Sequence, residues 1–321
     1  MIARRLLLAA PALLPLPALA QGARFPDRPL RLIIPVGVAG VTDLVGRILA
    51  EHMSNTLGRP VVPENIVGAG STVGALAFHR APADGHTIFI GTNNHPVMKA
   101  VYPNFPLDPV ADFLPLCLVG RQPFILAVHP DVPARDLPSL LAWLEREGGA
   151  ANYGSANPGA TNHMAGELLK QLTGARFTIV PYRTAANAVQ DLVAGRMQLS
   201  IDSPSMMAPL IRDGRLRALA VSSATRSAQF PDLPTIAEAG VPGYDLTAWQ
   251  VLFARPGTPP DAVAVLEGAA RRAVEDPGVK AKLLAVNVET WPDPSPAAAA
   301  AHVRAEVARW APIAAAITPG G

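Results

Sequence analysis

The chain has 321 residues, which is enough for two lobes with separate hydrophobic cores. Its 27 basic and 25 acidic residues nearly balance and form no basic run, which argues against nucleic acid or an anionic membrane surface as a partner. Cys117 is the only cysteine, so no disulfide can form within the chain. The seven histidines form no pair with metal-ligand spacing, and the sequence predicts neither a metal site nor a cofactor.

The first 20 residues have the pattern of a secretory signal peptide. Arg4 and Arg5 form its basic start, residues 6–16 its apolar core, and residues 18–20 a small-x-small cleavage site. A transmembrane anchor is the alternative, but the apolar run is about half of the ~20 residues that a span needs. We therefore expect cleavage after Ala20, while the arginine pair by itself does not decide between the Sec and twin-arginine export routes.

Strands and helices alternate along the first third of the chain. Residues 31–35 are expected to form a short buried strand, and a Gly/Ala loop leads from it into a helix that begins near Val41 and ends at Gly58. The next expected elements are a strand from Val61, a helix over 72–81 and a strand over 87–91. This alternation predicts a mostly parallel sheet that is covered by helices.

The same alternation continues on a second lobe. Its expected strands cover 124–129, the residues up to Tyr153, 177–182, 199–202 and 216–222, and its expected helices cover 137–146, 164–172 and 185–194. A strand over 246–254 returns to the first lobe, and helices follow over 261–275, 277–286 and 295–317. Crossings near 124–128 and 246–252 would form a hinge. They divide the mature chain into lobe 1, residues 21–124 plus 246–321, and lobe 2, residues 125–245.

Two loops of small residues precede helices, one in each half of the chain. They cover 32–43 and 152–164, and their lack of bulk lets a ligand approach the main chain. The first amides of a helix have no partner within the helix and lie at the positive end of its dipole, which suits a carboxylate. Two such loops in separate lobes predict that an organic anion is held between them.

The sequence contains few residues that could support catalysis. Ser155 lies in no Gly-x-Ser-x-Gly elbow, and its spacing to His163 does not define a nucleophile with its base. Residues 68–74 resemble a dinucleotide-binding loop, but the spacing of the last glycine is wrong. Asp43 and Asp202 follow strands, and three interpretations of them stay open: structural acids near a helix start, acceptors that shape a ligand pocket, or a general acid–base pair.

Several short motifs follow one another in a fixed order along the chain. They lie at residues 25–29, 35–43, 64–70, 83–85, 152–163, 180–183, 213–221, 230–240 and 256–259. With these motifs the chain resembles the periplasmic substrate-binding proteins of tripartite tricarboxylate transporters, the Bug family. The resemblance implies an α/β fold of the two-lobed periplasmic-binding-protein type II class, a "Venus flytrap" in which each lobe is a mostly parallel sheet flanked by helices.

In receptors of this family, main-chain amides and ordered waters hold a ligand carboxylate between one loop of each lobe. The implied ligand-binding residues of lobe 1 are Val36, Gly40, Val41, Thr42, Asp43, Gly70, Ser71, Thr92 and Asn93. Those of lobe 2 are Ser155, Asn157, Gly159, Ala160, Thr161, His163, Arg183, Asp202 and Ser203. Residues 37–41 replace a family loop that is richer in proline and glycine, and the Cβ atoms of Ala39 and Val41 are expected to exclude left-handed backbone angles.

The resemblance implies a periplasmic solute receptor and not an enzyme. Its expected partners are a small organic carboxylate and the subunits of a membrane transporter, and it is expected to act as a monomer. Two alternatives stay open: an accessory protein that feeds a sensor kinase, and a periplasmic enzyme on the same fold. The ligand also stays open, because a dicarboxylate paired with Arg183 and an aromatic monocarboxylate stacked near Trp249 are both compatible with the sequence.

Overall fold

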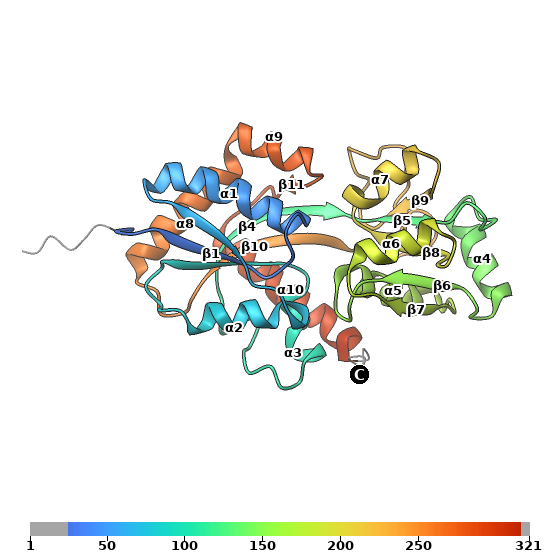
Figure 1. Ribbon diagram of the computed structural model, residues 1–321, viewed down its shortest axis with the longest axis horizontal. Helices are drawn as coiled ribbons and strands as arrows, with labels where there is room; N and C mark the ends of the chain where they lie inside the picture. Colours follow the sequence, from blue (N-terminus) through green and yellow to red (C-terminus); the bar gives the residue numbers. More distant parts are fainter. Residues whose placement is uncertain (1–24, 316–321) are drawn as a thin grey trace, which may run out of the picture.

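The computed structural model describes residues 25–315 and contains two β-sheets that lie side by side along the long axis of the molecule (Figure 1). We call the six-stranded sheet with its helices the first lobe, and the five-stranded sheet with its helices the second lobe. The expected signal peptide and the last residues of the expected C-terminal helix lie outside the described residues. The two-lobed α/β architecture that the sequence predicted is confirmed.

The sheet of the first lobe has the strand order β11-β4-β10-β3-β1-β2. Its strands are β1 (Leu30–Ile34), β2 (Val61–Asn65), β3 (Thr87–Gly91), β4 (Leu114–Pro123), β10 (Thr247–Ala254) and β11 (Glu289–Thr290). β1 pairs in parallel with β2 and β3, whereas β10 pairs antiparallel with β3 and β4. The sheet is therefore mixed, although β1 to β4 all run in one direction.

The sheet of the second lobe has the strand order β7-β6-β8-β5-β9. Its strands are β5 (Ile125–Val128), β6 (Asn152–Ser155), β7 (Thr178–Pro181), β8 (Leu199–Asp202) and β9 (Arg217–Val221). β5 alone runs against the other four. β5 and β10 are the strands with which the chain enters each lobe from the other. They lack the helical crossover that makes neighbouring strands parallel. For this reason they run antiparallel to their neighbours, although the sequence predicted mostly parallel sheets.

Helices cover both faces of each sheet because each helix presents an apolar stripe to it. In the first lobe, α1 (Val41–Leu57), α8 (Pro260–Glu275) and α9 (Pro277–Ala285) cover one face, and α2 (Thr72–Arg80) and α10 (Pro296–Ala315) cover the other. In the second lobe, α4 (Leu137–Glu147) and α5 (Thr161–Thr173) cover one face, and α6 (Ala185–Val193) and α7 (Pro204–Arg212) cover the other. Three single turns lie in loops of the first lobe: η1 (Ala69–Ser71), η2 (His95–Val97) and α3 (Met98–Val101).

The sequence did not predict β4 or α7. β4 contains two prolines and Gly120, and α7 contains Pro209, residues that often interrupt a strand or a helix. Gly120 lies under β11, where an added Cβ would come within 2.6 Å of Val288 Cγ1. The tertiary packing of both elements therefore outweighs their local preferences.

The chain crosses between the lobes at two adjacent places. β4 and β5 are separated only by Phe124, and Leu246 precedes β10. Ser222 joins the two crossings: its hydroxyl group accepts from the Phe124 N–H at 2.8 Å and donates to the Leu246 carbonyl oxygen at 2.5 Å. The Leu246 N–H in turn donates to the Ser222 carbonyl oxygen at 2.8 Å. The two crossings, at Phe124 and Leu246, are thus connected to each other by hydrogen bonds through Ser222.

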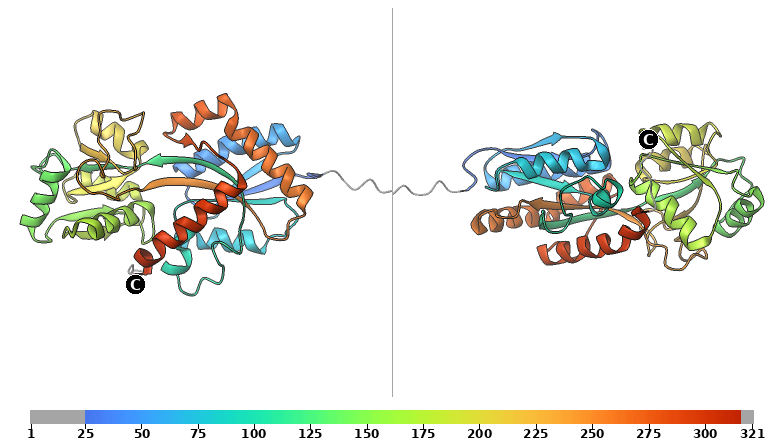
Figure 2. Two further views of the ribbon diagram at one scale, coloured as in Figure 1. Left: turned by 180° about the vertical axis from the view of Figure 1, so that it is seen from behind. Right: turned by 90° about the horizontal axis from the view of Figure 1, so that it is seen from below.

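The C-terminal helix α10 lies behind these crossing strands and contacts both lobes (Figure 2). Ala299 and Val303 pack against the sheet of the first lobe. Trp310 and Ala314, near the other end of the helix, pack into the core of the second lobe. The sequence-based division placed this helix in lobe 1 alone, and the exact lobe boundaries stay a prediction.

Candidate functional site

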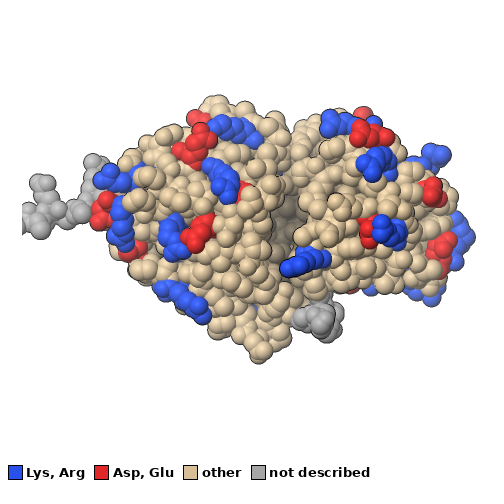
Figure 3. Space-filling model, in the orientation of Figure 1, with Lys and Arg blue, Asp and Glu red and all other residues tan. Residues whose placement is uncertain are grey.

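A cavity of about 230 Å³ lies between the lobes, beside β4 and β10. Figure 3 shows the hollow between the lobes, whose visible walls carry few charged side chains. Half of the predicted ligand-binding residues line the cavity, namely Val36, Gly40, Val41, Thr42, Thr92, Ala160, Thr161, Asp202 and Ser203. It is also lined by Ala156 and Asn162, which belong to the predicted loop 152–164, and by Asn94, which follows the predicted residues Thr92 and Asn93. The sequence did not indicate the other lining residues, Gln122, Phe124, Ala185, Ala248 and Gln250. Ligand binding by any of these residues stays a prediction.

Two helices begin at the wall of this cavity, one from each lobe. α1 starts after Gly40 and α5 starts after Ala160, and both cap residues have extended backbone angles (φ −70°, ψ 159° and φ −64°, ψ 153°). Glycine and alanine carry no polar side chain that could accept from the first amides of the helix. The amides at 41–43 and 161–163 therefore have neither a helical partner nor a side-chain cap. The positive ends of two helix dipoles meet in one space.

Asp43 lies behind the loop that leads into α1 and does not line the cavity. Its side chain is 1% exposed and accepts from the Ala39 N–H at 2.9 Å, from Arg47 Nε at 3.0 Å and from Asn65 Nδ2 at 2.8 Å. Burial raises the pKa of Asp43, but the hydrogen bonds from Arg47, Asn65 and Ala39 together outweigh it and hold the pKa below its usual value. Because Asn65 also donates to the Val36 carbonyl oxygen at 3.0 Å, this group shapes the loop rather than touching a ligand.

The expectation that a Cβ at position 39 excludes a left-handed backbone is wrong. Ala39 has φ 65°, a region that non-glycine residues adopt rarely. Its N–H donates to the Asp43 carboxylate, and this charge-assisted hydrogen bond holds the strained conformation in place. The loop therefore has a left-handed residue at position 39 although this residue is not glycine.

Asp202 ends β8 and reaches the cavity from the second lobe. Its Oδ2 accepts from Asn162 Nδ2 at 2.8 Å, and its Oδ1 accepts from the Ser203 N–H at 2.7 Å. Burial raises the pKa of Asp202, and the bonds from Ser203 and Asn162 offset this rise only in part. Asn162 Oδ1 also accepts from the Ala156 N–H at 3.1 Å, so Asn162 connects the start of α5 with both β6 and β8.

Residues 92–94, which include the predicted residues Thr92 and Asn93, lie in a loop after β3 and contact two different parts of the lobe. Thr92 and Asn94 line the cavity, whereas Asn93 pairs with β10: it donates to the Thr247 carbonyl oxygen at 2.8 Å and accepts from the Trp249 N–H at 2.9 Å. Ser71 lies one step behind the wall, where its hydroxyl group accepts from Asn94 Nδ2 at 3.3 Å. Gly70, with φ 59°, lies against Tyr102.

The remaining predicted residues of the second lobe do not line the cavity. Ser155 is fully buried and donates to the Ala156 carbonyl oxygen at 2.9 Å, and His163 faces Glu167 at 3.8 Å. Gly159 packs against Val101 of α3 with φ 80°. Asn157, half-buried, and Arg183, exposed, lie on the loops that lead into α5 and α6.

β10 directs Ala248 and Gln250 to the cavity and Trp249 to the opposite face, as the alternation of a strand requires. Trp249 is fully buried and donates from Nε1 to Glu306 of α10 at 2.9 Å. The expectation that a ligand ring could stack on Trp249 is therefore wrong. Gln122 lies on β4 beside these residues and donates from Nε2 to the Val286 carbonyl oxygen at 3.1 Å.

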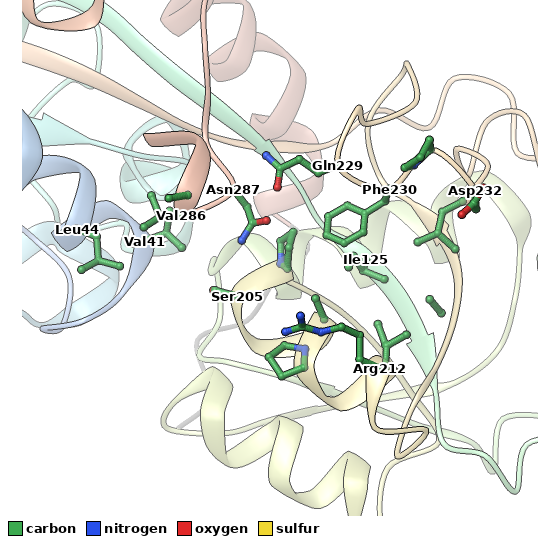
Figure 4. A pocket seen from close by; sticks show the side chains of 18 of the residues that line it. Val41, Leu44, Ile125, Ser205, Arg212, Gln229, Phe230, Asp232, Val286 and Asn287 are labelled. Carbon is green, nitrogen blue, oxygen red and sulfur yellow. The ribbon is translucent and has the colours of Figure 1, made fainter. Parts of the chain in front are cut away.

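A larger hollow of about 770 Å³ opens beside the first cavity and shares Val41 with it. Figure 4 shows apolar side chains on both of its sides, with Leu44 and Val286 from the first lobe and Phe230 from the second. Arg212 extends its guanidinium group from α7 into this space (Figure 4). The sequence had indicated Arg183 as the cation that could pair with a second acid group of the ligand, but Arg183 lines neither hollow.

Comparison with known proteins gives a consistent result. The family model of tripartite tricarboxylate transporter receptors matches residues 45–318. Rpa4515 of R. palustris, solved with adipate, is 34% identical with a TM-score of 0.82, and the match covers 92% of this chain and 100% of that one. MatC (Rpa3494) from Rhodopseudomonas palustris, solved with bound malate, is 31% identical with a TM-score of 0.80 and coverages of 90% and 100%.

The periplasmic binding protein BugD is also similar, at 30% identity with a TM-score of 0.81, and the match covers 92% of this chain and 100% of that one. Within residues 25–315, no helix combines the length and the apolar composition that crossing a membrane requires.

Proposed function

Because the chain belongs to the tripartite tricarboxylate transporter receptor family, we propose that it captures a small organic carboxylate between its lobes and delivers it, in the periplasm, to the membrane subunits of such a transporter. One observation carries this proposal: an uncapped helix start from each lobe meets in a single cavity. Relatives at 34% and 31% identity were solved with adipate and malate, which are both carboxylates.

Main-chain donors supply the attraction for the ligand. Among the described residues, no lysine, arginine or histidine lines the cavity between the lobes. A carboxylate there would accept from the first amides of α1 and α5 and from the hydroxyl groups of Thr42, Thr92 and Thr161. Hydrogen bonds to a charged group contribute about 1.5–3 kcal/mol each, and a helix start adds roughly 0.3–1 kcal/mol, or up to about 2 where it is partly buried.

Ligand capture would be coupled to closure of the lobes. The two crossings at Phe124 and Leu246, joined by Ser222, are suited to serve as the hinge because they are the short segments between the sheets. A carboxylate that contacts both helix starts binds the closed form better than the open form, and this difference drives closure. As the lobes approach, apolar side chains such as Val286 and Phe230 would meet across the larger hollow and add buried surface.

Thermal unfolding of the mature chain tests the proposal. Bound ligand is first removed by unfolding and refolding, and the protein is then heated with mono-, di- and tricarboxylates, amino acids and aromatic acids. A ligand at 100 times its dissociation constant stabilises by about 2.7 kcal/mol, which raises the melting temperature by several degrees. Small-angle scattering with the same ligand should show a smaller radius of gyration. A flat response across all acids would contradict the proposal.

A further inference from the structure

The wall of the cavity between the lobes carries one ionisable side chain, Asp202. It is 3% exposed, and no other lining residue is acidic or basic. Its carboxylate accepts from Asn162 Nδ2, from the Ser203 N–H and from the side chain of Ser203. A carboxylate offers about four lone-pair sites, so Asp202 can accept from a further donor. A plain carboxylate ligand brings no donor for it.

Asp202 also lies beside the place where the ligand carboxylate is proposed to bind. Its partner Asn162 is the second residue of α5, the helix whose first amides face the cavity. A ligand carboxylate at this helix start would therefore lie close to a second negative charge, and burial weakens the screening of their repulsion. A cation near the ligand carboxylate would remove this repulsion and compensate the burial of Asp202.

Resting on the proposed function, we infer that the ligand is an α-amino carboxylate that places its ammonium group on Asp202 and its carboxylate at the starts of α1 and α5. The α position follows from the contact between Asp202 and the first turn of α5, because cation and carboxylate must then be neighbouring groups of the ligand.

Calorimetry with acids that differ at one carbon tests the inference on the refolded mature chain. One set is norvaline, its α-hydroxy analogue and pentanoate, and the other is aspartate, malate and succinate. In at least one set, the amino member should bind at least about tenfold tighter than the unsubstituted acid, a difference of about 1.4 kcal/mol. The ω-amino isomer of norvaline should bind no better than pentanoate, because its cation lies too far from its carboxylate.

The outcomes separate this inference from the proposed function. Binding of pentanoate and succinate as tight as that of norvaline and aspartate would overturn the inference and leave a carboxylate receptor. A lack of binding by every acid of these sets and of the wider carboxylate panel would overturn both. Preference for the ω-amino isomer would also overturn the inference, since it would place the cation site away from the start of α5.

A variant then tests the role of Asp202 itself. Asp202→Asn removes the charge but keeps the shape and an acceptor for Asn162. In the set that binds, the amino acid should therefore bind at least about tenfold more weakly, while its unsubstituted acid binds equally well or better. Glu167→Gln removes a charge from α5 outside the cavity wall and should retain the preference of the unaltered protein. Unchanged binding of that amino acid by Asp202→Asn would overturn the inference. If this variant does not fold, the comparison of ligands on the unaltered protein still decides.

Discussion

Trp249 and Trp310 donate their indole N–H groups to the same oxygen, Oε2 of Glu306, each over 2.9 Å. Trp249 belongs to β10 in the first lobe, whereas Trp310 packs into the core of the second lobe. Glu306 is 8% exposed and also faces Arg309 at 3.7 Å. One carboxylate therefore connects the crossing strand with the helix that spans both lobes.

Removal of this carboxylate should destabilise the protein. Glu306→Ala leaves two indole N–H groups without their acceptor, and each unpaired buried donor costs about 1–3 kcal/mol. We expect the free energy of unfolding to fall by about 2–5 kcal/mol, and by less in Glu306→Gln, which keeps one amide oxygen as an acceptor. Urea unfolding followed by tryptophan fluorescence measures both. Glu145→Gln, on the exposed face of α4, is the control and should stay within about 0.5 kcal/mol of the unaltered protein.

His95 should make the stability of the first lobe depend on pH. Its ring is buried between Phe113 and Phe253, with centroids at 4.4 and 4.7 Å, and burial lowers the pKa of His95 to about 4. An unfolded chain binds this proton near pH 6.5. The contribution of His95 is therefore complete above about pH 6.5 and is lost as the pH falls toward 4, by about 3 kcal/mol between pH 7 and 4.

The variant His95→Gln checks this dependence. Glutamine can still donate to the Pro109 carbonyl oxygen, which lies 2.7 Å from His95 Nε2, but it binds no proton in this range. Urea unfolding at a series of pH values should show that the variant loses about 3 kcal/mol less than the unaltered protein between pH 7 and 4. Parallel profiles for the two proteins would show that His95 is not the group that titrates.

Single amide donors at the two helix starts can be removed by proline. Val41→Pro and Thr161→Pro change the first residue of α1 and α5, a position where proline is tolerated because its N–H has no helical partner. α7, α8 and α9 already begin with proline. Each variant should bind the ligand about tenfold more weakly, or about 1.4 kcal/mol, with little change in stability.

Two further variants distinguish the effect of losing the main-chain N–H from the effect of losing the side chain at these positions. Thr161→Val and Val41→Ala keep the main-chain N–H, so they should retain more affinity than the proline variants in calorimetry. Full affinity in both proline variants would exclude these amides as ligand donors.

The backbone strain at Ala39 predicts a stabilising substitution. Ala39→Gly should raise the free energy of unfolding by up to about 1 kcal/mol, because glycine adopts φ 65° without the Cβ penalty of roughly 1–2 kcal/mol. Val38→Gly, at the exposed neighbouring residue, should instead lower it by roughly 0.4–1 kcal/mol, because glycine only adds freedom to the unfolded chain there. Thermal unfolding of both variants measures these changes. If both substitutions changed the free energy of unfolding in the same direction, this would contradict the assignment of strain to Ala39.

The positions of most helices and strands along the chain could be predicted from the sequence because local signals mark their ends. The strands β3 (Thr87–Gly91) and β8 (Leu199–Asp202) agree in full with the predicted ranges. Gly58 ends α1 in a left-handed conformation at the predicted position, and Gly174 ends α5 in the same way, two residues after the predicted range. The loops before these helices were also found from local composition, because small residues precede a helical pattern in each lobe.

The partners of the site residues could not be predicted in this way. Asn162 and Asp202 meet across the second lobe although 40 residues separate them, and Asp43 is paired with Asn65 from the next strand. Such contacts depend on which strands become neighbours, and one-dimensional periodicity carries no information on that order. β4, which brings Gln122 to the cavity, was missed because its prolines and glycine weaken the local strand signal.

Trp249 and Gln250 show what the sequence by itself could determine and what it could not. The alternation of a strand determines that these neighbours point to opposite faces of β10. It does not determine which face is covered by α10 and which is left open to the second lobe. That choice depends on where the last helix of the chain packs, and only the tertiary structure decided that the tryptophan is covered and the glutamine reaches the cavity.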